Sequence, residues 1–84
     1  MTAGQLFGRI EPKTLSNEVV DRLRDAIMSG RLRPGERLIE SDIAEQMSVS
    51  RSPVREAFRQ IEHEGLIVSI PNQGSFVRQF AAQD

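Results

Sequence analysis

The sequence has 84 residues, 38% of them hydrophobic and 27% charged, which leaves room for one small globular domain and argues against disorder. It has no cysteine and a single histidine, His63, which excludes a disulfide framework, a thiolate metal site and a cluster of metal ligands. The net charge of −1 argues against binding to a polyanion by bulk charge alone, so any nucleic-acid site has to be local.

The first 30 residues predict an arm followed by a helix. Residues 1–13 contain two glycines and Pro12 without lasting periodicity, which predicts a flexible arm whose Leu6, Phe7 and Ile10 could still dock. From Ser16 to about Ser29 apolar residues recur at helical spacing and predict the first helix. Its apolar residues are Val19, Val20, Leu23, Ala26 and Ile27.

Two further helices are predicted after a short extended segment. Gly30 is expected to follow the first helix in a left-handed conformation, and Pro34-Gly35 turns the chain before a short strand at 37–39. Ser41 is a candidate cap for a second helix of about two turns, and residues 48–50 interrupt its pattern. A third helix then runs from Arg51 to about Glu64, with Pro53 in the first turn, where its missing N–H is tolerated.

A β-hairpin is predicted after Gly65. Leu66, Val68 and Ile70 alternate with other residues, as do Phe76, Arg78 and Phe80, and the turn residues Pro71-Asn72-Gln73-Gly74 separate the two runs. The expected fold is therefore α+β, mainly helical with a small hairpin. It is a winged helix-turn-helix in the order α-β-α-α-β-β.

The third helix has two chemically distinct faces. Arg51, Arg55, Arg59 and Ser52 fall within an arc of about 100°, because successive residues advance by about 100°. The opposite face carries Val54, Ala57, Phe58 and Ile61. The stretch from Arg51 to Gln60 has three arginines and one acid, so positive charge is concentrated here.

Two interpretations of the basic face are open. The arginine fork can hold guanine O6 and N7 or a phosphate, so arginines that begin a helix after a tight turn suit entry into the major groove. Alternatively, Ser50 and Ser52 are ordinary helix caps and the arginines form a solvated face paired with Glu45, Glu56 and Glu62. The preceding short helix and the following hairpin favour DNA binding.

Several motifs carry a resemblance over nearly the whole chain. They are Gly30-Arg31-Leu32-Arg33-Pro34-Gly35-Glu36-Arg37-Leu38, Glu40 with Ala44, Val49-Ser50-Arg51-Ser52-Pro53-Val54-Arg55-Glu56-Ala57, Glu64-Gly65-Leu66, and Asn72-Gln73-Gly74 with Phe76-Val77. With these motifs the sequence resembles the amino-terminal domain of the GntR family of bacterial regulators, in its FadR-like (FCD) branch. The resemblance implies an operator-reading domain of a metabolite-responsive transcription regulator, with repression expected and activation the alternative.

The resemblance also implies partners and site residues. The partner is a palindromic operator of double-stranded DNA, with Arg51 and Arg55 matching base contacts and Ser50 and Ser52 matching phosphate contacts. Gly74 matches a wing glycine whose missing side chain would let the hairpin approach the minor groove, unless it is simply a turn glycine. The candidate DNA-binding residues are Ser41, Ser50, Arg51, Ser52, Pro53, Arg55, Arg59, Asn72, Gln73 and Gly74.

Three positions depart from the family pattern. Ser41 stands where some FadR-like members carry an arginine that contacts DNA, and Gln73 stands where many have an arginine, which weakens the expected attraction of the wing for phosphate. Ser48 stands where relatives often have glycine, and a left-handed conformation there would cost about 1 kcal/mol.

The expected organisation is an arm over 1–13, the winged helix over 14–80 and, over 81–84, the start of a linker. The resemblance implies that a further carboxy-terminal domain would bind the metabolite and form a homodimer, so this domain is expected to bind no effector, cofactor or metal. No apolar run approaches a membrane span and no signal peptide is recognisable. We therefore expect a cytoplasmic bacterial protein, associated with the nucleoid and without a membrane partner.

Two other function classes fit the sequence less well. An enzyme is disfavoured, because His63 stands beside Glu62 and Glu64 late in a helix and the chain has no cysteine and no glycine-rich phosphate loop. A winged helix that binds only protein stays open because the overall charge is acidic, although the arginine face argues against it.

Overall fold

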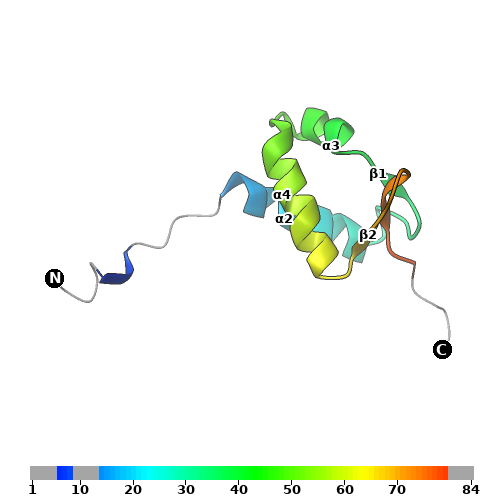
Figure 1. Cartoon of the computed structure of the whole chain (residues 1–84), viewed down its shortest axis with the longest axis horizontal. Helices are drawn as coiled ribbons and strands as arrows, with labels where there is room; N and C mark the ends of the chain where they lie inside the picture. The colour runs from blue at the N-terminus through cyan, green and yellow to red at the C-terminus, as the bar shows by residue number, and fades with distance from the viewer. Residues whose placement is uncertain (1–5, 9–13, 80–84) are drawn as a thin grey trace.

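The computed structural model describes residues 6–8 and 14–79 and shows three main helices beside a small sheet (Figure 1). The elements are α2 (Leu15–Met28), β1 (Arg37–Leu38), α3 (Glu40–Met47), α4 (Arg51–His63), β2 (Ile67–Ile70) and β3 (Gly74–Val77). This is the predicted order α-β-α-α-β-β, so the α+β winged helix-turn-helix fold is confirmed.

Helix α2 begins and ends with local hydrogen bonds. The Oγ1 atom of Thr14, at the N-cap, accepts a hydrogen bond from the Asn17 backbone N–H at 3.2 Å, which satisfies one of the unpaired donors of the first turn. At the other end Gly30 has φ +85°, as predicted for the residue that follows the helix.

Helix α3 begins differently from the prediction. Its N-cap position is Ile39, which has no side-chain cap, and Ser41 is an exposed residue within the first turn, so the prediction that Ser41 caps this helix was wrong. The chain leaves β1 in an extended conformation at Ile39, and Ile43 N–H already donates to Ile39 O at 3.1 Å. Glu40 and Asp42 then place two carboxylates at the positive end of the helix dipole.

A tight turn joins α3 to α4. Ser48 lies in the left-handed region with φ 57° and ψ 47°, the conformation anticipated for this position, and Val49 N–H donates to Ala44 O at 3.0 Å. Ser50 is the N-cap of α4 but its hydroxyl makes no capping hydrogen bond. The predicted inward residues of α4 are all buried: Val54, Ala57, Phe58 and Ile61.

The sheet has three antiparallel strands in the order β1-β3-β2. The hairpin pairs Ile67 with Val77 and Ile70 with Gly74, so the predicted wing is present. Gln73 N–H donates to Ile70 O at 2.9 Å, and Pro71 followed by Asn72 at φ 65° is the pattern of a type II turn.

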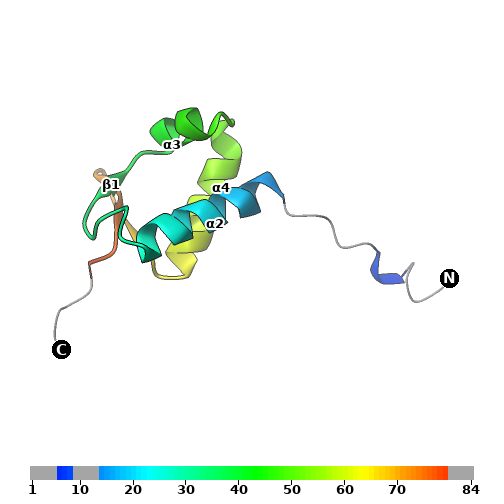
Figure 2. The same ribbon diagram turned by 180° about the vertical axis from the view of Figure 1, so that it is seen from behind.

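The core lies between the three helices and the sheet. Helix α4 lies in front of α2 in Figure 1 and behind it in Figure 2, so the two helices pack side by side. In both views α3 lies across one end of the pair, and the hairpin lies at the side. The buried residues of the core are Val19, Val20, Leu23, Leu38, Ala44, Val54, Ala57, Phe58, Ile61, Ile67 and Val77. Ala26 and Ile27, which were predicted with the same apolar face, are half-buried at its edge.

The predicted arm and linker fall largely outside the described residues. Leu6 and Phe7 are 64% and 84% exposed, so neither packs on the core, while Ile10, Phe80 and 81–84 lie outside the described residues. The boundaries of the arm and the linker stay predictions. Over the described ranges, no helix is both long and apolar enough to cross a bilayer.

Candidate nucleic-acid interface

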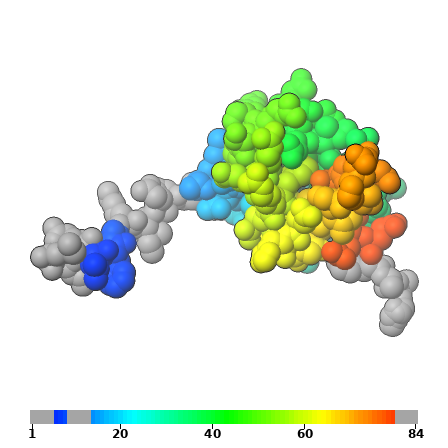
Figure 3. Space-filling model, in the orientation of Figure 1, coloured from blue at the N-terminus to red at the C-terminus, as the bar shows by residue number. Residues whose placement is uncertain are grey.

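The exposed face of α4 carries a stripe of arginines. Arg51, Arg55 and Arg59 follow one another at intervals of four residues, so their Cα atoms rise by about 6 Å per step along the helix. All three are exposed, while the opposite face of the helix is buried. Figure 3 shows α4, α3 and the hairpin reaching the same face of the molecule. A convex basic helix beside a hairpin is the shape that a major groove and its neighbouring minor groove accept.

If the arginines formed only a solvated face, they would pair with Glu45, Glu56 and Glu62, but the structure shows a different pairing. Arg55 Nε donates to Glu40 Oε1 of α3 at 3.4 Å. Between residues 14 and 79, Arg51 and Arg59 make no ion pair, and no arginine of α4 pairs with a glutamate of its own helix. Glu62 instead accepts from Ser69 Oγ at 3.2 Å. The guanidinium groups of Arg51 and Arg59 therefore remain available to an anion.

Hydroxyl groups gather where the amino ends of α2 and α4 meet. An open cleft of about 310 Å³ there is lined by Thr14, Leu15, Ser16, Ser50, Ser52, Pro53 and Glu56. The Ser50 hydroxyl is unused as a cap, and the backbone N–H groups of a first helical turn point outward from such a position. Hydroxyls and a helix N-terminus together suit a phosphate.

The wing tip is exposed at Asn72, Gln73 and Gly74. Gly74 has φ +118°, and a Cβ atom built on it would lie 3.1 Å from Nε and 3.4 Å from Nη2 of Arg37. Glycine at this position therefore does more than complete the turn, because it leaves space for an arginine from β1. The candidate residues predicted from the sequence do not include Arg37, because the sequence pattern indicates only that it lies in a short strand.

A smaller cleft of about 220 Å³ lies between the wing and the start of α4. Its polar lining comes from Arg37, Glu40, Ser41, Arg51 and Ser75. It brings Ser41 and Arg51, both predicted site residues, next to Gly74 at the tip end of the wing. The predicted residues thus fall into three neighbouring groups: residues 50–59 on α4 and its N-cap, Ser41 at the start of α3, and the wing.

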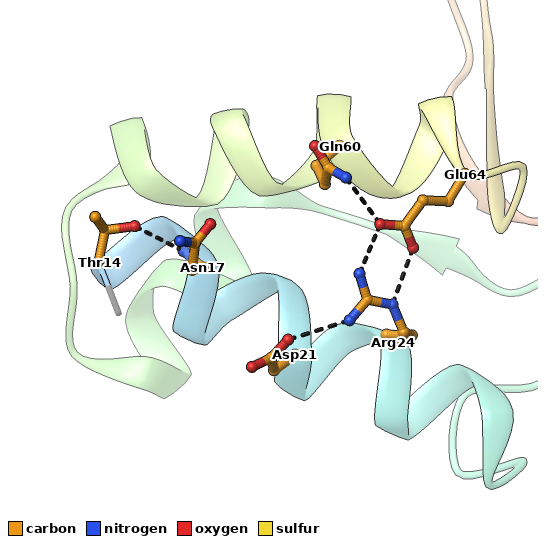
Figure 4. Close-up of polar contacts among 6 residues, drawn as sticks. All are labelled: Thr14, Asn17, Asp21, Arg24, Gln60 and Glu64. Atoms are coloured by element: carbon orange, nitrogen blue, oxygen red, sulfur yellow. Dashed lines mark hydrogen bonds and ion pairs between the residues drawn. The ribbon is translucent and has the colours of Figure 1, made fainter. Parts of the chain in front are cut away.

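The other end of α4 carries a polar joint with α2 (Figure 4). Arg24 donates to both oxygens of Glu64, from Nε at 2.9 Å and from Nη2 at 2.6 Å, and Gln60 Nε2 donates to the same carboxylate at 2.9 Å. The hydrogen bonds from Arg24, followed by that from Gln60, lower the pKa of Glu64 to about 2. Helix α4 has 13 residues, so this joint lies about 20 Å from Arg51 and holds the helix without touching the candidate interface.

The described part of the chain offers no group of side chains that could bind a metal ion. Across residues 6–8 and 14–79, no three or more His, Cys, Asp or Glu side chains are grouped so that they could hold an ion. The interface is instead rich in arginine guanidinium and serine hydroxyl groups. Its chemistry is that of a surface for anions and for base edges.

The sequence is similar to a known family and to several of its members. A family model described as "Bacterial regulatory proteins, gntR family" matches residues 15–77. The chain is 40% identical over 76 residues to a probable D-xylose utilization operon transcriptional repressor of Paenarthrobacter nicotinovorans, covering 90% of this chain and 34% of that protein. It is 38% identical over 64 residues to the uncharacterized HTH-type transcriptional regulator YdhC of Bacillus subtilis, covering 76% of this chain and 29% of that one.

A solved structure shows the same fold. The crystal structure of a transcriptional regulator GntR from Rhodococcus sp. RHA1 superimposes with a TM-score of 0.76 at 45% identity, covering 80% of this chain and 32% of that one. The chain spans about a quarter to a third of the length of the curated relatives that it matches.

Proposed function

The chain belongs to the gntR family of bacterial regulatory proteins, and from this membership we propose that its winged helix is the operator-reading domain of a transcription regulator. The observation that carries the proposal is the exposed arginine stripe along α4, opposite a buried face and beside a wing. Its partner is double-stranded DNA. Relatives named as regulators rather than enzymes point the same way, to a function other than catalysis.

In this proposal α4 enters the major groove. Arg51 and Arg55 contact base edges, since a guanidinium can bind guanine O6 and N7 with two parallel hydrogen bonds. Arg59, one turn further along, contacts the flanking backbone. The wing residues Asn72, Gln73 and Gly74 approach the adjacent minor groove.

Backbone contacts fix the register of the helix. Ser50 and Ser52, with Pro53 in the same cleft, face a phosphate at the amino end of α4, where hydroxyls and backbone N–H groups converge. Ser41 contributes a hydroxyl at the start of α3. Glu40 accepts from Nε of Arg55, so both Nη groups of that arginine are left to bind a base. Glu40 is thus a positioning residue in this proposal.

The finer features of the regulator also belong to the proposal. The motifs favour the FadR-like branch, a palindromic operator and a homodimer formed through a further carboxy-terminal domain that binds a metabolite. This domain itself binds no effector or cofactor, and the protein works in the bacterial cytoplasm, at the nucleoid. Repression is favoured because the relative from Paenarthrobacter nicotinovorans is named a repressor.

The experiment that tests the proposal is selection of bound sequences from a random pool of DNA duplexes, with retention measured as the salt concentration rises. We expect retention that falls steeply with salt, because neutralised phosphates release counterions, and enrichment of one short motif. A protein-binding winged helix is the second candidate, which the acidic net charge supports. Failure to retain any duplex at low salt would favour it and reject DNA binding.

A further inference from the structure

Arg37 is held at the junction of the sheet and the candidate interface. It lies in β1 opposite Phe76 of β3, and the same connection is tied by hydrogen bonds from Val77 N–H to Glu36 O and from Gly35 N–H to Val77 O, both 2.8 Å. Its side chain passes over Gly74, where even a methyl group would lie 3.1 Å from Nε. The sheet therefore fixes the backbone of Arg37, and the glycine provides the surface on which its guanidinium rests.

Among the described residues, no side chain pairs with the charge of Arg37. In the region from residue 14 to residue 79, neither Arg37 nor Arg51 makes a hydrogen bond or an ion pair through its side chain. Both line the 220 Å³ cleft, together with the exposed hydroxyl of Ser41. The one carboxylate in the lining is Glu40, which accepts from Arg55. Two unpaired guanidinium groups and a hydroxyl facing one opening are a set of donors for an anion.

The position of this cleft indicates which anion would bind there. It separates the amino end of α4 from the wing, that is, the element that would fill a major groove from the element that would approach the next minor groove. The ridge between these two grooves is a sugar-phosphate backbone. A duplex that receives both elements must lay that backbone along the cleft.

We propose that Arg37 and Ser41 bind a DNA backbone phosphodiester in this cleft, next to the base-contacting Arg51, and that Gly74 leaves room for the guanidinium of Arg37. This inference rests on the proposed function and adds Arg37 and the reason for Gly74 to it. The site reads no base. It contributes affinity that is uniform across sequences and sensitive to salt.

The test compares Arg37→Gln with Arg22→Gln on random and selected duplexes over a range of salt concentrations. Arg22 is a matched control for the lost charge, since it lies on α2 and pairs with Glu18 at 3.2 Å. Arg37→Gln should reduce the salt slope by about 1 and weaken binding about eightfold at 0.1 M salt, because one fewer phosphate is neutralised. The order of preferred sequences should not change. Arg37→Lys should keep most of the slope, since a phosphate responds to charge.

A double-mutant cycle tests the role of Gly74. Gly74→Ala alone should weaken binding, but in the Arg37→Gln background it should add no further loss if it acts by displacing Arg37. An equal loss in both backgrounds would show that the strained φ of residue 74 acts on its own, and would overturn that part of the inference.

The outcomes separate this inference from the proposed function. If the unchanged protein binds duplex DNA and Arg37→Gln binds like Arg22→Gln, the phosphodiester site is wrong and operator reading stands. A changed order of preferred sequences in Arg37→Gln would make Arg37 a base contact and also overturn the inference. Failure of the unchanged protein to bind any duplex would reject both.

Discussion

Arg55 and Glu40 belong to the two helices of the helix-turn-helix, and their side chains meet at 3.4 Å. Replacing Arg55 with Ala should cost about 1–3 kcal/mol of binding and relax preference at one or two base pairs, if the guanidinium binds a guanine with two hydrogen bonds. The measurement is binding to a panel of single-base operator variants. Uniform weakening across the panel would make Arg55 a phosphate contact instead.

Glu40 should limit binding to random DNA. Its carboxylate lies in the cleft beside Arg37 and Arg51, so it repels phosphate while it holds Arg55. Glu40→Gln should therefore raise affinity for random duplexes and reduce the ratio of preferred to random binding. Glu45→Gln, an equal change of charge on an exposed residue of the same helix, is the control. If both variants behave alike, only net charge matters and Glu40 does not position Arg55.

Ser48 carries the one strained serine conformation among the helix ends described. With φ 57° and ψ 47° it pays the steric penalty of a Cβ in the left-handed region, so Ser48→Gly should stabilise the fold by about 1 kcal/mol. Ser29 ends α2 at φ −84°, where glycine gains nothing, so Ser29→Gly should destabilise it. Urea denaturation checks both. A loss of stability in Ser48→Gly would refute the strain argument.

At the scale of helices, the joint between α2 and α4 predicts a pH dependence. Glu64 has a pKa of about 2 in the folded chain against 4.5 for the unperturbed group. Its stabilising effect is therefore fully present above about pH 4.5 and is lost as the pH falls from there toward 2. The carboxylate is 25% exposed and held by two bonds from Arg24, so we expect a contribution on the order of 1–2 kcal/mol.

The measurement is the difference in free energy of unfolding between the unchanged chain and Glu64→Gln at a series of pH values. The difference should be constant near neutral pH and shrink below pH 4.5. Glu18→Gln, which removes an exposed pair on the same helix α2, should have a smaller effect. A difference for Glu64→Gln that persists unchanged near pH 2 would contradict the assigned pairing.

At the scale of helices and strands, the local sequence predicts most elements but not the contacts between them. Periodicity and turn residues predicted the helices and the hairpin, because those signals depend on residues within about two turns. The start of α3 was misjudged, since the exit from β1 and not the serine at position 41 determines it. Contacts such as Arg24 with Glu64 or Arg37 over Gly74 join residues far apart in the chain. No local period encodes these contacts, and so the sequence predicted neither of them.

At the scale of the whole molecule, charge is unevenly distributed over the surface. The net charge is −1, yet α4 presents its arginines on one face, and the carboxylate of Glu64 at the far end of the helix is paired with Arg24. A chain of this charge is not attracted to DNA from every side. The field at the arginine face orients the encounter, which is why salt should affect binding by this domain despite its acidic balance.

The apolar surface argues for a monomer in solution. The exposed large apolar side chains of the described residues come from several segments: Leu6 and Phe7 from the arm, Leu15 and Met28 from the two ends of α2, Ile39 from the start of α3 and Ile70 from β2. Because they come from separate segments and the buried apolar residues fill one small core, we expect no surface patch large enough for a stable dimer. The 84-residue chain should therefore sediment near 9.4 kDa at micromolar concentration. It should occupy two half-sites of one duplex almost independently, whereas fusion to a dimerising segment should raise affinity through effective concentration when the half-site spacing fits. A tight dimer of the unfused chain in sedimentation would show that a pairing surface lies within these residues after all.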